Sequence, residues 1–220
     1  MCRWVFVCGG ADMKNEDDDR GATENADAGD GIASGPRLDA EKAASAAEDI
    51  ALMLRAKNDD LAAFSLLVKK HQQSVMNFFA RNGVYRDVED LAQEAFLKLH
   101  RARHRYQPTA KFTTFLYLIA RQVMIDSIRH GSRKAKLMEN YGKEAEQMEK
   151  APAMRGEKGD AELALDCLSR PLREAVVLVV MQGVAYAEAA EILDVPTGTV
   201  KSRVSAAMQK MREKMGKYEV

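Results

Sequence analysis

Four carboxylates in one segment come nearest to a catalytic set in this chain. Asp87, Glu89, Asp90 and Glu94 lie close together in the stretch DVEDLAQEAFLKL. Catalysis on phosphodiesters requires carboxylates grouped around a metal ion, or an activated nucleophile. The spacing of these four residues distributes them around a helix, and no histidine motif accompanies them. We therefore expect no enzymatic activity, no cofactor and no metal site.

A second group of side chains is suited to binding nucleic acid. It lies in YAEAAEILDVPTGTVKSRVSAAMQKMREKM, residues 186–215, where apolar residues recur every three or four positions. This spacing predicts a helix over 186–193, a break at 194–196, and a second helix capped by Thr197 or Thr199.

Cations and hydroxyls cluster near the start of that second helix, in the motif GTVKSR. Lys201, Ser202 and Arg203 lie largely outside the apolar stripe, as does Lys210. Two helices joined by a short break, with such side chains early in the second, are typical of a helix-turn-helix that enters the major groove. An αα-hairpin with a solvated face is the alternative that the pattern alone leaves open.

The distribution of charge also favours a polyanionic partner. Lys plus Arg and Asp plus Glu both number 33, so the net charge is zero. The residues before Asp49 are nevertheless strongly acidic, whereas 98–136 and 201–217 are basic. Two separated basic segments fit a nucleic acid that is held at two places.

The remaining apolar pattern predicts helices throughout. Spacings of three and four predict helices over 49–57, 61–81 and 113–129, with another that starts at Asp87 as N-cap and has Asp90 in a capping-box position. Leu61 and Phe64 are assigned to the buried stripe of the second of these helices. No segment alternates as a strand does.

Length and composition limit the cellular setting. A chain of 220 residues has room for one domain or two small ones. No apolar run approaches the roughly 18 residues that span a bilayer, and the apolar run near the start is shorter than a signal peptide requires. The three cysteines are scattered, which argues against a disulfide framework. We expect a cytoplasmic protein without a membrane segment.

These patterns together predict an all-α chain of two small helical domains joined by a flexible linker. The C-terminal domain is expected to be a helix-turn-helix of the winged-helix-like DNA-binding class. The expected boundaries are a disordered acidic extension over 1–44, a first domain over 45–136, a linker over 137–160 and a second domain over 161–217.

Two motifs carry a family resemblance. LSRPLREAVVLVVMQGVAYAEAAEILDVPTGTVKSRV resembles the promoter-binding C-terminal domain of bacterial sigma factors of the extracytoplasmic-function (ECF) group. DVEDLAQEAFLKL and KFTTFLYLIAR resemble consecutive segments of the other conserved sigma domain. Both motifs occur in the family's order, with a linker of suitable length between them.

The resemblance implies that the chain binds core RNA polymerase, directs it to promoter DNA and helps to melt the minus-ten region. It implies that Asp90, Gln93, Glu94 and Leu97 dock on the clamp helices of the large catalytic subunit. The residues implied for the minus-ten element are Arg105, Tyr106, Lys111, Phe112, Arg121, Gln122 and Arg129. Those implied for the minus-thirty-five element are Thr199, Lys201, Ser202, Arg203 and Lys210.

Two further points stay open at this stage. Phe112 and Phe115 also fit simple core positions, and family members are often held inactive by an anti-sigma protein. The main alternative is a stand-alone helix-turn-helix regulator, which explains the C-terminal motif but leaves DVEDLAQEAFLKL without a role.

Overall fold

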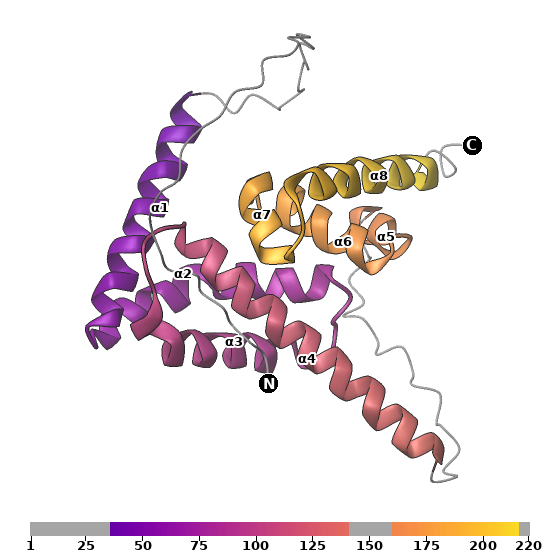
Figure 1. Cartoon of the computed structure of the whole chain (residues 1–220), viewed down its shortest axis with the longest axis horizontal. Coiled ribbons are helices and arrows are strands. Elements are labelled where there is room, and N and C mark those ends of the chain that lie inside the picture. The colour runs from indigo at the N-terminus through magenta and orange to yellow at the C-terminus, as the bar shows by residue number, and fades with distance from the viewer. Residues whose placement is uncertain (1–35, 141–159, 216–220) are drawn as a thin grey trace, which may run out of the picture. The chain divides into compact units, whose positions relative to one another are not determined.

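Four long helices build the N-terminal part of the structure (Figure 1). They are α1 (Pro36–Lys57), α2 (Leu61–Arg81), α3 (Val88–Ala102) and α4 (Phe112–Asn140), with the short 3-10 turn η1 (Arg103–Arg105) after α3. This computed structural model describes residues 36–140 and 160–215. Side chains with almost no exposure fill the space between these helices, among them Met53, Leu67, Phe78, Phe79, Leu99, Leu116 and Met124.

The C-terminal part consists of shorter helices. They are α5 (Asp160–Asp166), α6 (Arg170–Val176), the π-helical turn η2 (Val177–Met181), α7 (Tyr186–Leu193) and α8 (Thr197–Met215). The helix-turn-helix is confirmed, because α7 ends at Leu193, the left-handed Asp194 (φ 55°) follows it, and α8 begins at Thr197. Val200, Val204 and Ala207 of α8 are buried, as their spacing predicts.

The all-α fold class is confirmed, since the described ranges contain helices and turns and no strand. All of the described residues belong to one compact unit, Pro36–Val220. The buried apolar residues of both helical domains form a continuous cluster within it.

Two helices are longer than their patterns predict. Helix α1 begins at Pro36 rather than at Asp49, so part of the expected disordered extension is helical. Its first half is rich in alanine, which has the highest helix propensity, and proline is well tolerated in a first helical turn. Helix α4 continues to Asn140, into the range expected for the linker. The rest of the expected extension and linker lies outside the described residues.

The starts of two helices differ from the caps that the sequence predicts. Asp87 occupies the N-cap position of α3, but its backbone is left-handed (φ 56°) and its side chain makes no capping hydrogen bond. The capping box with Asp90 is therefore not formed. Thr197 and Thr199 lie inside the first turn of α8, where the carbonyl of Pro196 accepts hydrogen bonds from the amides of Thr199 and Val200.

Candidate functional site

The exposed face of α3 carries the four residues expected to bind polymerase. Leu91, Ala95 and Leu99 of α3 are buried, which turns Asp90, Gln93, Glu94 and Leu97 to the surface. Leu97 is 57% exposed, although it is a large apolar residue. A carboxylate and amide face around one exposed apolar side chain suits a basic helical partner, because charged groups can pair at the rim while the apolar anchor is covered.

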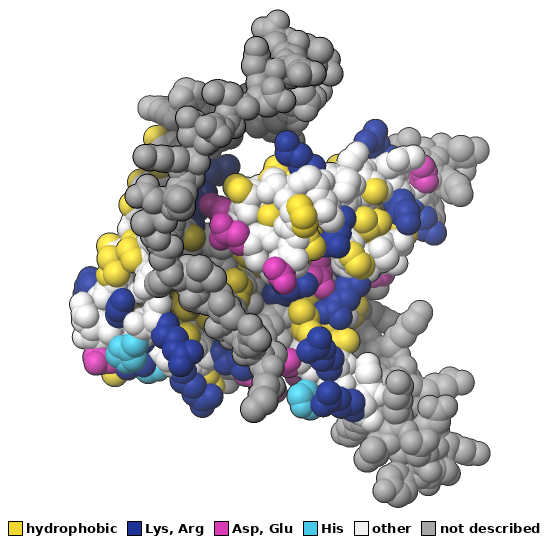
Figure 2. Space-filling view, in the orientation of Figure 1, with side chains coloured by type: hydrophobic (Ala, Val, Ile, Leu, Met, Phe, Trp, Pro, Cys, Tyr) yellow, Lys and Arg dark blue, Asp and Glu magenta, His cyan; other side chains and the backbone are white. Residues whose placement is uncertain are grey.

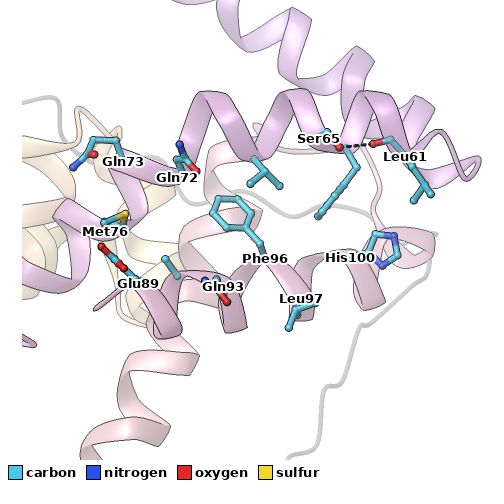
Figure 3. Close-up of a pocket in the computed structure, with 13 residues that line it drawn as sticks. Leu61, Ser65, Gln72, Gln73, Met76, Glu89, Gln93, Phe96, Leu97 and His100 are labelled. Carbon is cyan, nitrogen blue, oxygen red and sulfur yellow. Dashed lines mark hydrogen bonds between the residues drawn. The ribbon is translucent and has the colours of Figure 1, made fainter. Parts of the chain in front are cut away.

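A groove lies between α2 and α3, next to this face (Figure 3). Its volume is about 860 Å³, and Phe64, Val68, Met76 and Phe96 form much of its apolar lining. Gln93 and Leu97 line it from α3, so the groove and the expected polymerase-binding face share two residues.

Sequence patterning missed the contribution of α2 to this groove. Leu61 was assigned to the buried stripe of α2, but it is 64% exposed and lies at the edge of the groove. Gln72 and Gln73 also line the groove from α2. A helical period cannot separate a residue that faces the core from one that faces an open groove beside it, so Leu61 gave no distinct signal.

A histidine at one end of the groove is largely neutral near physiological pH. His100 lines the groove, and its ring packs edge-on against Phe64 with 4.9 Å between ring centroids. Burial, followed by the nearby Arg103 guanidinium, lowers the pKa of His100 from its usual 6.5. A neutral imidazole keeps this end of the groove compatible with an apolar partner.

Two aromatic residues expected to contact the minus-ten element are instead in the core. Tyr106 is 2% exposed and Phe112 is 1% exposed. Tyr106 packs against the half-buried Phe115, and Phe112 packs against His71. Neither ring is exposed in this structure, and an aromatic ring must be exposed to stack on a base.

Most of the cations expected to contact the minus-ten element are exposed. Arg105, Lys111 and Arg129 are exposed, whereas Arg121 and Gln122 are half-buried. Figure 2 shows Lys and Arg side chains near the middle of α4. These residues provide donors for a phosphate backbone, while the two buried aromatic residues hold the loop before α4 in place.

Two of these cations contact carboxylates of the C-terminal helices. Arg121 donates from Nε to Oε2 of Glu174 at 2.8 Å, and Lys111 Nζ lies 2.9 Å from Oε1 of Glu188. Sequence reasoning missed both carboxylates, since nothing in the local pattern of α6 or α7 shows which residues of α4 they meet.

Helix α8 presents the residues expected to bind the minus-thirty-five element. Lys201, Ser202 and Lys210 are exposed, and Thr199 and Arg203 are half-buried. The hydroxyl of Ser202 donates to the carbonyl of Thr199 at 3.0 Å. The free lone pairs of that hydroxyl and the two lysines leave this face able to contact base edges and phosphates.

A buried carboxylate lies between α1 and α2 and contacts two basic side chains. Asp49 of α1 is 3% exposed and accepts from His71 Nε2 at 3.0 Å, with Lys70 Nζ 2.6 Å away. Burial opposes ionisation of Asp49, but these two partners outweigh it and lower its pKa from the usual 3.8. The ionised carboxylate thus joins α1 to α2.

The described part of the chain offers no grouped metal ligands. No set of three His, Cys, Asp or Glu side chains among the described residues could hold a metal ion. Within the same residues, none of the helices has the length and apolar character that crossing a membrane requires.

Comparison with family models matches both helical domains. Residues 67–134 match sigma-70 region 2, and residues 159–211 match sigma-70 region 4. The first range contains α3 and most of α4, and the second contains α7 and most of α8.

The chain also matches known proteins over nearly their whole length. The chain is 31% identical over 179 residues to the ECF RNA polymerase sigma-E factor of Escherichia coli K12, covering 76% of this chain and 94% of the relative. It is 28% identical to the protein of the same name from Haemophilus influenzae, covering 76% and 95% of the two chains.

Two solved structures share the fold. The sigma factor RpoE of Bartonella quintana, solved with the anti-sigma factor NepR, has a TM-score of 0.59 and 25% identity, covering 70% of this chain and 96% of RpoE. CnrH, solved with the cytosolic domain of CnrY, has a TM-score of 0.60 and 24% identity, covering 77% and 97%.

Proposed function

Because the chain belongs to the ECF family of bacterial RNA polymerase sigma factors, we propose that it binds core RNA polymerase, directs it to two-part promoters and helps to melt the minus-ten region. One observation carries this proposal: matches to sigma regions 2 and 4 occur in one chain, in the family's order. A stand-alone helix-turn-helix regulator is not favoured, because it leaves the region 2 match without a role. The protein would act in the cytoplasm and perform no chemistry itself.

The polymerase contact is assigned to the exposed face of α3 and the adjoining groove. Asp90, Gln93, Glu94 and Leu97 are accessible there, and the groove adds apolar surface from α2. An amphipathic helical partner would bury Leu97 and pair its basic side chains with Asp90 and Glu94. This arrangement fits the clamp helices of the large catalytic subunit.

The promoter contacts are assigned to two cationic surfaces. Arg105, Lys111, Arg121, Gln122 and Arg129 would hold the minus-ten element, with Tyr106 and Phe112 supporting their loop from the core. Thr199, Lys201, Ser202, Arg203 and Lys210 would bind the minus-thirty-five element from α8. We keep 45–136 and 161–217 as the two functional domains, with a linker from 137 to 160 whose first residues continue α4.

An anti-sigma protein is a further expected partner. RpoE of Bartonella quintana was solved in complex with such a factor, and this chain resembles it over 70% of its length. The groove between α2 and α3 offers such a protein an apolar surface that also serves the polymerase contact. Binding there would block holoenzyme assembly by direct competition.

Holoenzyme assembly tests the polymerase contact. The variant Asp90→Lys/Glu94→Lys should lose co-purification with core RNA polymerase, because like charges would then face a basic partner. Glu41→Lys is a control for a single charge reversal elsewhere, since Glu41 is an exposed acidic residue of α1. Undiminished assembly of the double variant would refute the assignment of α3, and no association of the wild-type chain would refute the proposed function.

A further inference from the structure

The turn between α1 and α2 projects a carboxylate toward η1. Asp59, in this turn, has a left-handed backbone (φ 65°), which is uncommon for a residue other than glycine. Asp60 fixes the turn on both sides, because it caps α2 by accepting from the amide of Ala63 at 3.0 Å and also accepts from Arg55 at 2.7 Å. The side chain of Asp59 takes no part in those bonds and reaches a partner outside the turn.

That partner is Arg103, the first residue of η1. Its Nη2 donates to Oδ1 of Asp59, and this hydrogen bond lowers the pKa of Asp59 from its usual 3.8. Its Nη1 donates to the carbonyl of His100 at 2.8 Å, so one guanidinium joins the end of α3 to the turn. The side chain of Arg103 is only 17% exposed, so packing as well as hydrogen bonding limits its movement.

Lys57, the last residue of α1, holds the next part of the chain. Its Nζ donates to the carbonyl of Tyr106 at 2.8 Å, and the amide of Tyr106 donates to the carbonyl of Arg103 at 3.1 Å. Both backbone polar groups of Tyr106 are therefore bound, and its ring is buried. Tyr106 is the first residue of the loop over 106–111, which we call the minus-ten loop.

The minus-ten loop thus starts from a fixed point. Arg105 directly precedes it and Lys111 is its last residue, and both are exposed cations that we assign to minus-ten DNA. At the far end of the loop, Phe112 packs against His71 of α2. The positions of the two cations accordingly depend on contacts with α1 and α2.

We propose that Lys57 and Arg103 are positioning residues for promoter opening: they hold the minus-ten loop so that its cations reach the DNA. Neither residue lines the groove assigned to polymerase, so the proposal separates promoter opening from holoenzyme assembly. An exposed ion pair and a hydrogen bond to a carbonyl add little to folding stability, whereas a binding group displaced by about 1 Å loses much of its effect. This inference rests on the proposed function, because it takes the minus-ten loop to bind promoter DNA.

Promoter opening by reconstituted holoenzyme tests the role of Lys57. The variant Lys57→Met keeps the apolar part of the side chain and removes the donor to Tyr106. On a promoter fragment mapped with wild-type holoenzyme, permanganate reactivity of unpaired minus-ten thymines should appear about tenfold more slowly. Co-purification with core polymerase and the thermal unfolding midpoint should match wild type. Lys57→Arg, which restores a donor, should recover most of the rate.

The control for this variant is a lysine that does not touch the loop. Lys69→Met makes the same charge change at an exposed lysine of α2 and should open the promoter at the wild-type rate. Equal slowing in both variants, or a wild-type rate with Lys57→Met, would overturn the proposal. The salt dependence of DNA binding tests for a direct phosphate contact, because losing one reduces the log–log slope by about one. Such a reduction with Lys57→Met would also overturn the positioning role.

Arg103→Met and Arg55→Met form a second matched pair. Both variants lose an arginine that binds an aspartate of the same turn, but only Arg103 also joins that turn to the end of α3. Opening should slow with Arg103→Met and keep the wild-type rate with Arg55→Met, and equal rates in the two variants would contradict the proposal. Failure of wild-type holoenzyme to open any promoter would refute the proposed function and, with it, this inference.

Discussion

The carboxylate of Asp49 holds α1 against α2 from a position almost without solvent. It bonds His71 at 3.0 Å and lies 2.6 Å from the ammonium of Lys70, while Glu48 pairs with the same lysine from the surface. Removing one member of a buried ionic cluster leaves the others without compensation, which costs far more than losing an exposed pair.

Replacing Asp49 should therefore destabilise the N-terminal domain. We expect Asp49→Asn to lower the free energy of unfolding by about 3 kcal/mol. Glu48→Gln, which removes the exposed partner of Lys70, should cost no more than about 1 kcal/mol. Urea denaturation followed by circular dichroism measures both, and equal losses in the two variants would contradict this role of burial.

The same cluster gives stability a defined dependence on pH. The pKa of Asp49 is lowered from 3.8 in the folded chain, so its contribution is fully present above that value. The contribution is lost as the pH falls through the lower folded pKa, because the protonated carboxyl no longer attracts its partners. The difference in unfolding free energy between wild type and Asp49→Asn should be constant above about pH 5 and shrink below about pH 4. A difference that stays constant into strong acid would exclude this linkage.

Single residues also show where sequence reasoning reached its limit. Leu61 follows the helical period of α2 yet faces the groove, and Tyr106 lies in a loop yet is buried. Periodicity reports which residues share a face of a helix, but it does not report what covers that face. The pairing of Asp49 with His71 depends on how two helices pack, which no local pattern encodes.

Helix α3 separates residues that hold the fold from residues that we propose to bind polymerase. Leu99 has no exposure, whereas Leu97, two positions earlier, is 57% exposed. The helical turn places these two neighbours on opposite faces, so the same substitution probes different properties at each position.

Truncation of Leu99 should lower stability, whereas truncation of Leu97 should weaken polymerase binding. Leu99→Ala should lower the free energy of unfolding by about 2–5 kcal/mol through a buried cavity. Leu97→Ala should change stability by no more than about 0.5 kcal/mol but weaken binding to core polymerase by more than 1 kcal/mol. Unfolding and polymerase-binding titrations on both variants test this, and normal polymerase binding by Leu97→Ala would exclude it as the anchor.

The turn after α2 brings the backbone of one domain close to the other. Gly83 has φ +86°, and a Cβ at this position would lie 2.7 Å from Nη1 of Arg173. Arg173 is held by the carbonyl of Leu165 and by Asp166 at 3.1 Å, so it has limited freedom to move away. Glycine is thus required here for its backbone conformation and for the close approach.

Gly83→Ala should consequently lower the free energy of unfolding by more than Gly183→Ala does. Gly183 also has a positive φ of 68°, but a Cβ there would meet nothing within 4 Å. Gly183→Ala should cost about 1–2 kcal/mol for the left-handed conformation alone. Gly83→Ala should lower the free energy of unfolding further, because the new Cβ would also displace Arg173. Thermal and urea unfolding compare the two, and equal costs would show that Arg173 moves aside freely.

Helix ends were predictable where the chain carries strong local signals and not elsewhere. The bounds 186–193 of α7 follow from its apolar period and the break at 194–196. The start of α1 and the end of α4 carry no comparable signal. Both helices extend beyond their apolar patterns. The groove is formed by α2 and α3 together, so the apolar pattern of either helix alone could not predict it.

At the scale of the whole molecule, the two sigma motifs predicted the family. No pattern in the sequence predicted the contacts between the two helical domains. Glu174 and Arg121 stand 53 positions apart, and each looks like an ordinary charge on its own helix. Only the fold brings them within 2.8 Å. This contact joins α4 to α6 and does not involve α3, where we propose the polymerase surface.

Transcription from mapped start sites tests the central claim most directly. Purified core polymerase with the full-length chain should initiate at discrete positions on genomic DNA, with shared elements near minus ten and minus thirty-five. Lys201→Ala should weaken those starts because it removes a phosphate or base contact from α8, and Asp90→Lys/Glu94→Lys should abolish them. Start positions identical to those of core polymerase alone would contradict the account.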